Sequence, residues 1–371
     1  MERFMCSGKE WEPAGPRADA VAVMMSGGVD SSVTAAMLKR SGREVVGVTM
    51  QIPSGIGPSG CGVELRACCG TGASEIARRL EIPHYFVDVR EEFRRFVIEP
   101  FRDAYRAGRT PSPCIDCNTY VKFGAVMEFV REALGIEQVA TGHYARISAD
   151  ALHAAADETK DQSYFLYGIR RADLARILFP LGSQTKIRTR ELAAEYGLEL
   201  TARAESVELC FAAQGDYRAA LGERPDAGPG DVLDLEGNVL GSHKGISQYT
   251  VGQREGLGIA AGTPLYIVEI NPEANTIVVG DRAASSRRDV RAEKLNILAP
   301  DLLSRGGRFF GKIRSRVGAA ACVVTELSGE QIAVEFDEPE HGVTPGQHLV
   351  LYGDNGRVVV GGEIVRRGRR L

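Results

Sequence analysis

The stretch AVMMSGGVDSS, residues 22–32, contains the feature that decides the fold. Residues 21–25 form an apolar run that is too short for a helix and typical of a buried strand. Gly27 and Gly28 follow, and glycine permits positive φ and a close approach of the backbone to a ligand. Residues 30–32, Asp-Ser-Ser, are of the types that open helices, and apolar residues then recur at helical spacing. The stretch therefore predicts a strand, a glycine turn and a helix N-terminus.

This arrangement directs backbone N–H groups and the positive end of a helix dipole at one point, which suits a phosphate. The stretch is not the G-x-x-x-x-G-K-[ST] loop, because no lysine follows the glycines, and it is not G-x-G-x-x-G. Residues 26–31, Ser-Gly-Gly-Val-Asp-Ser, resemble the pyrophosphate loop of ATP pyrophosphatases, which split ATP into AMP and pyrophosphate. A Gly-Gly pair alone also fits a plain βα turn, but the complete pattern between strand and helix favours a nucleotide.

Composition limits the class of protein. The chain has 371 residues, 44% hydrophobic and 25% charged, as in globular proteins of two or three domains. No apolar run is long enough to span a membrane, and residues 1–19 lack the apolar core of an export signal and read as a flexible lead-in. Eight cysteines without such a signal indicate the reducing cytoplasm. The net charge of −4 gives no overall nucleic-acid signal, and no membrane or DNA partner is expected.

Strands and helices alternate in residues 20–215, which predicts an α/β domain with a doubly wound parallel sheet. Ligands of such sheets bind beyond the carboxyl ends of the strands. Ser26, Met50 and Gly142 each follow an expected strand, so we expect them to line one crevice. The expected strands are 44–50, 85–89 and 138–141, and the expected helices are 73–80, 91–107, 118–134, 172–178 and 186–196.

Two cysteines at C-x-x-C spacing, Cys114 and Cys117, lie on the proline-rich segment 111–118. The prolines exclude a helix there, and a helix is expected to begin just beyond. A helix N-terminus lowers the pKa of a thiol and so favours the reactive thiolate. Two buried structural cysteines or half of a zinc site are the other interpretations, although no second C-x-x-C or paired histidine follows. Cys210 lies in an expected extended apolar segment, where a buried inert cysteine is an equal alternative.

The second half is rich in expected strands. Residues 216–280 are expected to form a small β-rich domain, with a hairpin in residues 230–240. Residues 281–371 are expected to form a six-stranded β-barrel, a class that often binds RNA or carbohydrate. The expected barrel strands are 308–317, 320–326, 331–336, 348–352 and 358–364.

Seven motifs in order make the chain resemble the tRNA-specific 2-thiouridylase family, from about residue 21 to the C-terminus. These motifs are Ser26–Ser31, Gly108–Pro113 with Cys117 and Asn118, Thr141–Tyr144, Lys160–Leu166, Cys210 with Phe211, Gly252–Gly258 and Thr344–Gln347.

The resemblance implies a sulfurtransferase that uses ATP and Mg²⁺ to replace the C2 oxygen of the wobble uridine of tRNA, bound by its anticodon loop, with sulfur from a donor protein. It implies Cys117 as the nucleophile-side cysteine and Cys210 as the persulfide carrier. The other residues that it implies are, for ATP, Met24, Met25, Ser26, Gly27, Gly28, Val29, Asp30, Ser31, Met50 and Gly142; for the target base, Ser112, Pro113 and Cys114; and for tRNA, His143, Lys160, Asp161, Gln162, Arg316, Val317 and Gln347.

Many members of the family carry an acidic residue where this chain has Cys114. Three cysteines in one crevice, Cys114, Cys117 and Cys210, could hold a [4Fe–4S] cluster and form an alternative route to the same thiolation. An amide-forming synthetase with a pyrophosphate loop, or an RNA-binding protein with a relic loop, remain as alternatives. The two relay cysteines argue against the synthetase, and the complete pyrophosphate loop argues against the relic.

Overall fold

The computed structural model describes residues 4–6, 10, 19–53, 71–198, 209–211, 217–222, 228–259 and 262–366. The chain forms two compact units, residues 1–97 with 114–215, and residues 98–113 with 216–371. The segment 98–113 therefore belongs with the C-terminal half of the chain rather than with its sequence neighbours. In the described ranges no helix is both long and apolar enough to cross a lipid bilayer.

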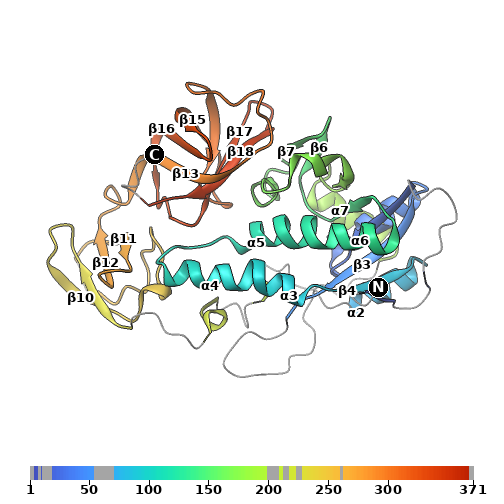
Figure 1. Cartoon of the computed structure of the whole chain (residues 1–371), viewed down its shortest axis with the longest axis horizontal. Coiled ribbons are helices and arrows are strands. Elements are labelled where there is room, and N and C mark those ends of the chain that lie inside the picture. The colour runs from blue at the N-terminus through green and yellow to red at the C-terminus, as the bar shows by residue number, and fades with distance from the viewer. Residues whose placement is uncertain are drawn as a thin grey trace. The chain divides into compact units, whose positions relative to one another are not determined.

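The first unit is built on a six-stranded sheet in the order β1-β4-β3-β2-β5-β8. Neighbours from β4 to β8 pair in parallel, as the predicted doubly wound α/β fold requires. The antiparallel edge strand β1 lies in the expected flexible lead-in. The strands are β1 Phe4–Cys6, β2 Ala20–Met24, β3 Glu44–Gln51, β4 His84–Asp88, β5 Gln138–Ala140 and β8 Ile177–Leu178 (Figure 1).

The helices of this unit follow the predicted order but not always the predicted type. The expected helices at 91–107 and 118–134 each contain a π-helical stretch, which regular α periodicity does not reveal. The helix expected over 172–178 is wrong at residues 177–178. A short 3₁₀ helix ends at Arg176, and the edge strand β8 follows directly. The elements are α1 Val29–Arg40, α2 Thr71–Arg79, α3 Arg90–Phe93, η2 Arg94–Ile98, α5 Pro113–Asp116, η3 Cys117–Val126, α6 Met127–Leu134, η4 Ser163–Phe165, η5 Arg171–Arg176 and α7 Lys186–Glu195, with a hairpin of β6 Arg146–Ser148 and β7 Ala151–His153.

Burial explains why the central strands read as continuous apolar runs. Every residue of β2 is buried, because the sheet is covered on both faces. Val21 and Val23 pack with residues of α1, α2 and α7 in one core cluster. This core fixes the carboxyl end of β2, and with it the glycine turn that follows.

The second unit contains a four-stranded sheet, β10-β9-β12-β11, and a closed barrel, β13-β16-β15-β14-β17-β18. The predicted six-stranded barrel is confirmed (orange to red in Figure 1). Its elements are α4 Glu99–Arg106, η7 Tyr217–Leu221, β9 Gly230–Leu233, β10 Val239–His243, η8 Ile246–Gln248, β11 Tyr266–Asn271, β12 Thr276–Gly280, β13 Ser286–Ile297, β14 Arg308–Lys312, β15 Ala320–Ser328, β16 Gln331–His341, β17 His348–Tyr352 and β18 Val358–Ile364.

Two barrel strands differ from the sequence expectation. The strand expected over 308–317 ends at Lys312, and the chain then turns. Strand β13, twelve residues long, is absent from the expected set. It is rich in charged residues, and only Val290 and Ala292 along it are fully buried in the barrel core.

Buried histidines make the stability of the first unit depend on pH. His84 on β4 is 1% exposed, and its ring nitrogens lie 2.8 Å from Thr49 Oγ1 and 3.2 Å from Ser74 Oγ. Burial lowers the pKa of His84 from 6.5 to about 4. The folded state thus favours neutral imidazole, so the stabilisation is complete above about pH 6.5 and is lost as the pH falls towards 4.

We predict that the His84→Asn variant loses less unfolding free energy than the wild type when the pH falls from 7 to 4. The difference should be about 3 kcal/mol, the equivalent of the shift in pKa. Urea denaturation at several pH values measures it, with His348→Asn as a comparison, because burial also lowers the pKa of that barrel histidine to about 4. Equal pH dependence in wild type and His84→Asn would contradict the prediction.

Candidate active site

The glycine turn after β2 lies against the first turns of two helices. Gly27 has φ of +75°, and a Cβ there would stand 2.9 Å from the backbone nitrogen of Ala73 in α2. Helix α1 begins at Val29, immediately beyond the turn. Two helix N-termini therefore meet at the turn, and only a residue without a side chain fits between them. This arrangement offers backbone N–H groups and two helix dipoles to an anion.

Serines hold the turn in shape. The Ser31 hydroxyl accepts from the backbone N–H of Ser26 at 3.2 Å and donates to the carbonyl of Gly28 at 3.1 Å. The Ser32 hydroxyl donates to the same carbonyl at 2.9 Å. We expected residues 30–32 to open the helix. The N-cap is instead Gly28, which has no side chain that could accept a hydrogen bond from the first turn. The serines instead tie the first turn back onto the glycine turn.

Asp30 is the centre of a polar cluster that the sequence did not predict. Lys186 Nζ lies 2.7 and 2.8 Å from its two carboxylate oxygens, and the Tyr144 hydroxyl donates to Oδ1 at 3.0 Å. The side chain of Lys186 is 10% exposed and that of Asp30 is 33% exposed. Burial raises the pKa of Tyr144, so its hydroxyl keeps the proton that it donates. The cluster joins the first turn of α1, the segment after β5 and the first residue of α7.

Gly142 and Met50 lie at the same edge of the sheet, as predicted. Strand β2 pairs with β3 on one side and with β5 on the other, so the carboxyl ends of the three strands are adjacent. Met50 lies within β3 rather than after it. A Cβ on Gly142 would stand 2.8 Å from backbone atoms of both Asp30 and Ser31. The segment after β5 therefore touches the start of α1 backbone to backbone.

The cysteine segment enters this unit through α5. Ser112 and Pro113 are buried, Cys114 is exposed, and Cys117 is buried as the first residue of η3. Protein atoms around the partly accessible Cys114 raise the pKa of its thiol by desolvation, against the opposing charge of Lys122. The expectation that the prolines exclude a helix here is corrected, because α5 begins at Pro113, a helix position that proline tolerates.

Cys210 is exposed, in contrast to Cys117. Its neighbour Phe211 is buried and packs edge-on against Phe93 of α3, with ring centroids 5.8 Å apart. Of the expected extended segment the structure describes residues 209–211, and Cys210 and Phe211 form a turn there. Cys61, Cys68 and Cys69 lie outside the described residues.

The three candidate cluster ligands are all among the described residues. No group of three or more histidine, cysteine or acidic side chains in the described ranges is placed to hold a metal. Cys114, Cys117 and Cys210 are therefore not gathered into such a group among these residues. All three are thiols outside any disulfide, as a reaction by persulfide relay requires of its starting state.

His143 follows Gly142 and is held firmly. Its Nδ1 lies 2.7 Å from Thr141 Oγ1, and its ring packs against Phe123 and Phe179. Burial, and next the charge of Lys122, lower its pKa well below 6.5. His143 is therefore neutral at physiological pH and can meet RNA by stacking or hydrogen bonding but not as a cation.

Two of the three residues at 160–162 shape the chain. Asp161 accepts hydrogen bonds from Ala155 and Ser163, and Gln162 Oε1 accepts from the backbone N–H of Tyr144 at 2.9 Å. Lys160 borders an open cavity of about 480 Å³. Its lining also includes the acidic residues Asp157 and Glu158 and two further cationic residues, Lys186 and Arg190, so charges of both signs border this cavity.

The remaining expected tRNA contacts belong to the second unit. Arg316 is exposed in the turn beyond β14, whereas Val317 packs against the barrel core. Gln347 precedes β17, and its amide nitrogen donates to the carbonyls of Thr110 and Pro111.

Comparison with known proteins covers nearly all of the chain. Residues 19–214 match the tRNA methyl transferase HUP domain, residues 219–281 the tRNA methyl transferase PRC-barrel domain, and residues 287–365 the aminomethyltransferase beta-barrel domain. The tRNA-specific 2-thiouridylase MnmA of Moorella thermoacetica is 44% identical over 92% of this chain and 97% of its own length. That of Rippkaea orientalis is 42% identical over 93% and 99%, and that of Roseiflexus castenholzii 41% over 94% and 99%.

We predict that Gly142→Ala weakens ATP binding roughly 5- to 150-fold, since overpacking costs about 1–3 kcal/mol. The added methyl would overlap the backbone of Asp30 and Ser31, which cannot move without displacing the first turn of α1. Gly318→Ala is the matched control, because no heavy atom lies within 4 Å of a Cβ there. Calorimetric titration with ATP measures the effect, and an unchanged affinity in a folded Gly142→Ala protein would contradict the role given to this contact.

Proposed function

Because this chain belongs to the tRNA-specific 2-thiouridylase family, we propose that it uses ATP to replace the C2 oxygen of the wobble uridine of tRNA with sulfur. The observation that supports this most directly is the glycine turn between two helix N-termini, in one unit with Cys117 and Cys210. The turn suits a phosphate chain, and the two cysteines suit sulfur transfer. The products from ATP are AMP and pyrophosphate.

The first step activates the base. A carbonyl oxygen on uracil is a very poor leaving group, so the C2 oxygen attacks the α-phosphorus of ATP and pyrophosphate departs. Residues 24–31 with Met50 and Gly142 bind the nucleotide, and their backbone N–H groups stabilise the departing charge. Mg²⁺ bound with ATP would neutralise further phosphate charge, and Asp30 is the carboxylate in residues 24–31 that would hold it. Lys186 already pairs with that carboxylate and orients it.

The second step delivers sulfur. A donor protein charges Cys210 with a persulfide, whose terminal sulfur attacks C2 and displaces AMP. The thiolate of Cys117 then attacks the sulfur atom of Cys210. This breaks the sulfur–sulfur bond, leaves the electron pair on the sulfur of the base, and forms a Cys117–Cys210 disulfide. A cellular dithiol reduces the disulfide for the next turnover.

The different exposure of the two cysteines supports these roles. Cys210 is exposed, so a donor protein can reach it, whereas Cys117 is buried at the start of η3 and requires a substrate brought to it. Cys114, three residues before Cys117, flanks the target base with Ser112 and Pro113.

The tRNA is the partner that brings the base. An anticodon base must leave its stack to reach Cys117, which costs a few kcal/mol and least in a single-stranded loop. Lys160 offers positive charge, His143 a neutral ring, and Arg316 an exposed guanidinium to RNA. Asp161 and Gln162 follow Lys160 in the first unit, and Val317 and Gln347 are the further residues of the second unit that would contact tRNA.

We predict that Asp30→Ala abolishes AMP formation in the presence of tRNA, while tRNA binds with nearly unchanged affinity. Without the carboxylate, the ion pair with Lys186 is lost and the loop loses its acidic group. Because the loss of this ion pair also destabilises the fold, Asp30→Asn and a melting curve accompany the measurement. Asp103→Ala, an exposed aspartate on α4, is the control. Unchanged AMP release by Asp30→Ala would overturn the proposed role of the turn.

We predict that Cys210→Ser eliminates both the protein persulfide and 2-thiouridine, whereas Cys117→Ser blocks thiolation but lets the persulfide accumulate on Cys210. Mass spectrometry of the protein and nucleoside analysis of the tRNA measure the two products. A single mutant that thiolates at the normal rate would refute the relay. Anaerobic purification tests the cluster route, because about four irons per chain, lost together with activity in Cys114→Ala, would establish it instead.

A further inference from the structure

Two aromatic rings meet on the surface of the first unit. Tyr120 of η3 stacks on Phe96 of η2, with ring centroids 5.3 Å apart and an angle of 22° between the ring planes. Tyr120 is 49% exposed, and Phe96 is half-buried. Because Phe96 covers one face of the tyrosine ring, the accessible part of that ring is its other face and its edge. The pair therefore presents a flat aromatic surface to solvent.

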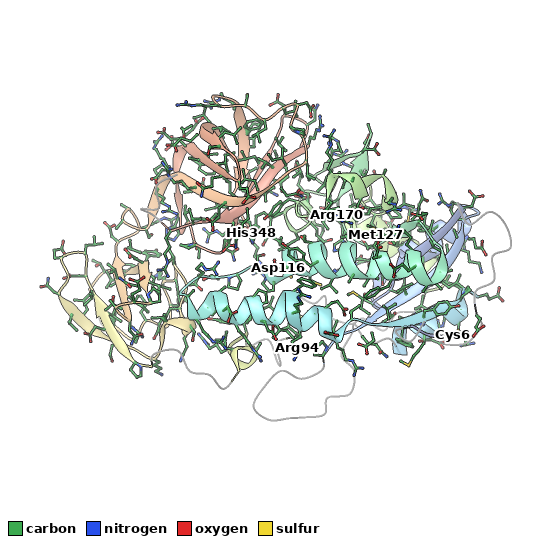
Figure 2. All side chains as sticks on the ribbon, viewed as in Figure 1. Cys6, Arg94, Asp116, Met127, Arg170 and His348 are labelled. Carbon is green, nitrogen blue, oxygen red and sulfur yellow. The ribbon has the colours of Figure 1, made fainter. Side chains whose placement is uncertain are left out.

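Positive charge accompanies the two rings. The guanidinium of Arg95 lies over the ring of Phe96, 5.0 Å from its centroid, and the exposed Arg94, labelled in Figure 2, directly precedes it. Residues 94–97 and 117–126, which carry the rings, contain three cationic side chains and no carboxylate. The carboxylates that border these two stretches in the sequence are Glu91, Glu92, Glu99 and Asp116. The stretches themselves are therefore positive, which favours an RNA strand as the ligand of the rings.

Both rings stand on π-helical turns, Phe96 within η2 and Tyr120 within η3. Such turns are rare, and they occur frequently at functional sites. A single exposed apolar side chain needs no explanation. Tyr120 differs from that case, because a second ring holds it flat while half of it stays accessible. A fixed and accessible ring beside cations suits a nucleobase, since every base has a face that can stack and a phosphate that follows it.

The position of Tyr120 along η3 places it close to the reactive cysteine. Tyr120 follows Cys117 by three residues in the same helix. A helix rises about 1.5 Å per residue, so the two residues lie roughly one turn or less apart along the axis. Successive bases of a stacked strand are about 3.4 Å apart. A nucleotide next to the one that reacts at Cys117 is therefore within reach of the tyrosine ring.

We propose that the ring of Tyr120, backed by Phe96, is a stacking platform for the anticodon-loop base that neighbours the target uridine, and that Arg95 supplies positive charge to its phosphate. This proposal rests on the proposed function for the identity of the RNA. When the target base leaves its stack, the neighbouring base loses a stacking partner, and the tyrosine ring takes that partner's place. The platform thus offsets part of the cost of extracting the target base.

The decisive variants are Tyr120→Ala, which removes the ring, and Tyr120→Phe, which keeps the ring and removes only the hydroxyl. Tyr120→Leu keeps an apolar contact with Phe96 but has no planar face, and it serves if the alanine variant does not fold. Phe310→Ala is the matched control, because Phe310 on β14 of the second unit is another exposed aromatic residue, 43% exposed.

The probe is an RNA hairpin of the anticodon stem and loop, with fluorescent 2-aminopurine in place of the base on one side or the other of the target uridine. We expect binding to the full-length wild type to quench the fluorescence at one of these positions. Tyr120→Ala should lose this quenching and bind the hairpin roughly 5- to 150-fold more weakly, the range for base–aromatic stacking. Tyr120→Phe and Phe310→Ala should match the wild type. Arg95→Gln should lower the slope of log affinity against log salt by about 0.7, the value of one phosphate contact on a single strand.

Three results would overturn the proposal. Unchanged affinity and quenching in a folded Tyr120→Ala protein would show that no base stacks on the ring. An equal loss of affinity in Tyr120→Phe would assign the contact to the hydroxyl and not to the ring. Normal RNA binding by Tyr120→Ala, with slower transfer of sulfur from the donor protein to Cys210, would make the rings a protein contact. A wild type that quenches the probe but makes no 2-thiouridine would refute the proposed function alone, because the binding measurement involves no turnover.

Discussion

The contact between Asp30 and Lys186 is the interaction on which the first unit's site depends. It joins the start of α1 to the start of α7, two residues that are 156 positions apart, and Tyr144 adds the segment after β5. A buried ammonium requires a partner, because an unpaired charge in the interior is costly. The ion pair therefore holds the carboxylate beside the glycine turn.

The second unit also depends on contacts between segments that are distant in the sequence. Its barrel has a core of its own, closed by β13 and β18, and needs no help from the segment 98–113 to bury apolar surface. Yet the loop before β17 and the end of β18 both bind that segment. The barrel of the second unit therefore also holds a segment that lies, in the sequence, between two stretches of the first unit.

The sequence predicted local features well and distant pairings poorly. The turn at residues 26–31 was predictable because its strand, glycines and helix are contiguous, and β17 and β18 were predicted with their observed bounds. Lys186 was missed because nothing near it in sequence signals a carboxylate so far away. Strand β13 was missed because its charged side chains hide a short apolar alternation, and the π-helical stretches at 94–98 and 117–126 carry no distinct signature.

Three cysteines differ in their surroundings and therefore in the reactions open to them. Cys322 lies fully buried in the barrel, where burial raises its pKa to about 12 and leaves it an inert apolar side chain. Cys210 is exposed beside the anchored ring of Phe211, so it is accessible and yet fixed. Cys117 is buried but stands at the start of a helix. In the proposed reaction the exposed thiol receives sulfur from a macromolecule and the buried thiol acts only once the base is in place. That order protects the persulfide, because Cys117 attacks the sulfur atom of Cys210 only after the terminal sulfur has been bonded to C2 of the base.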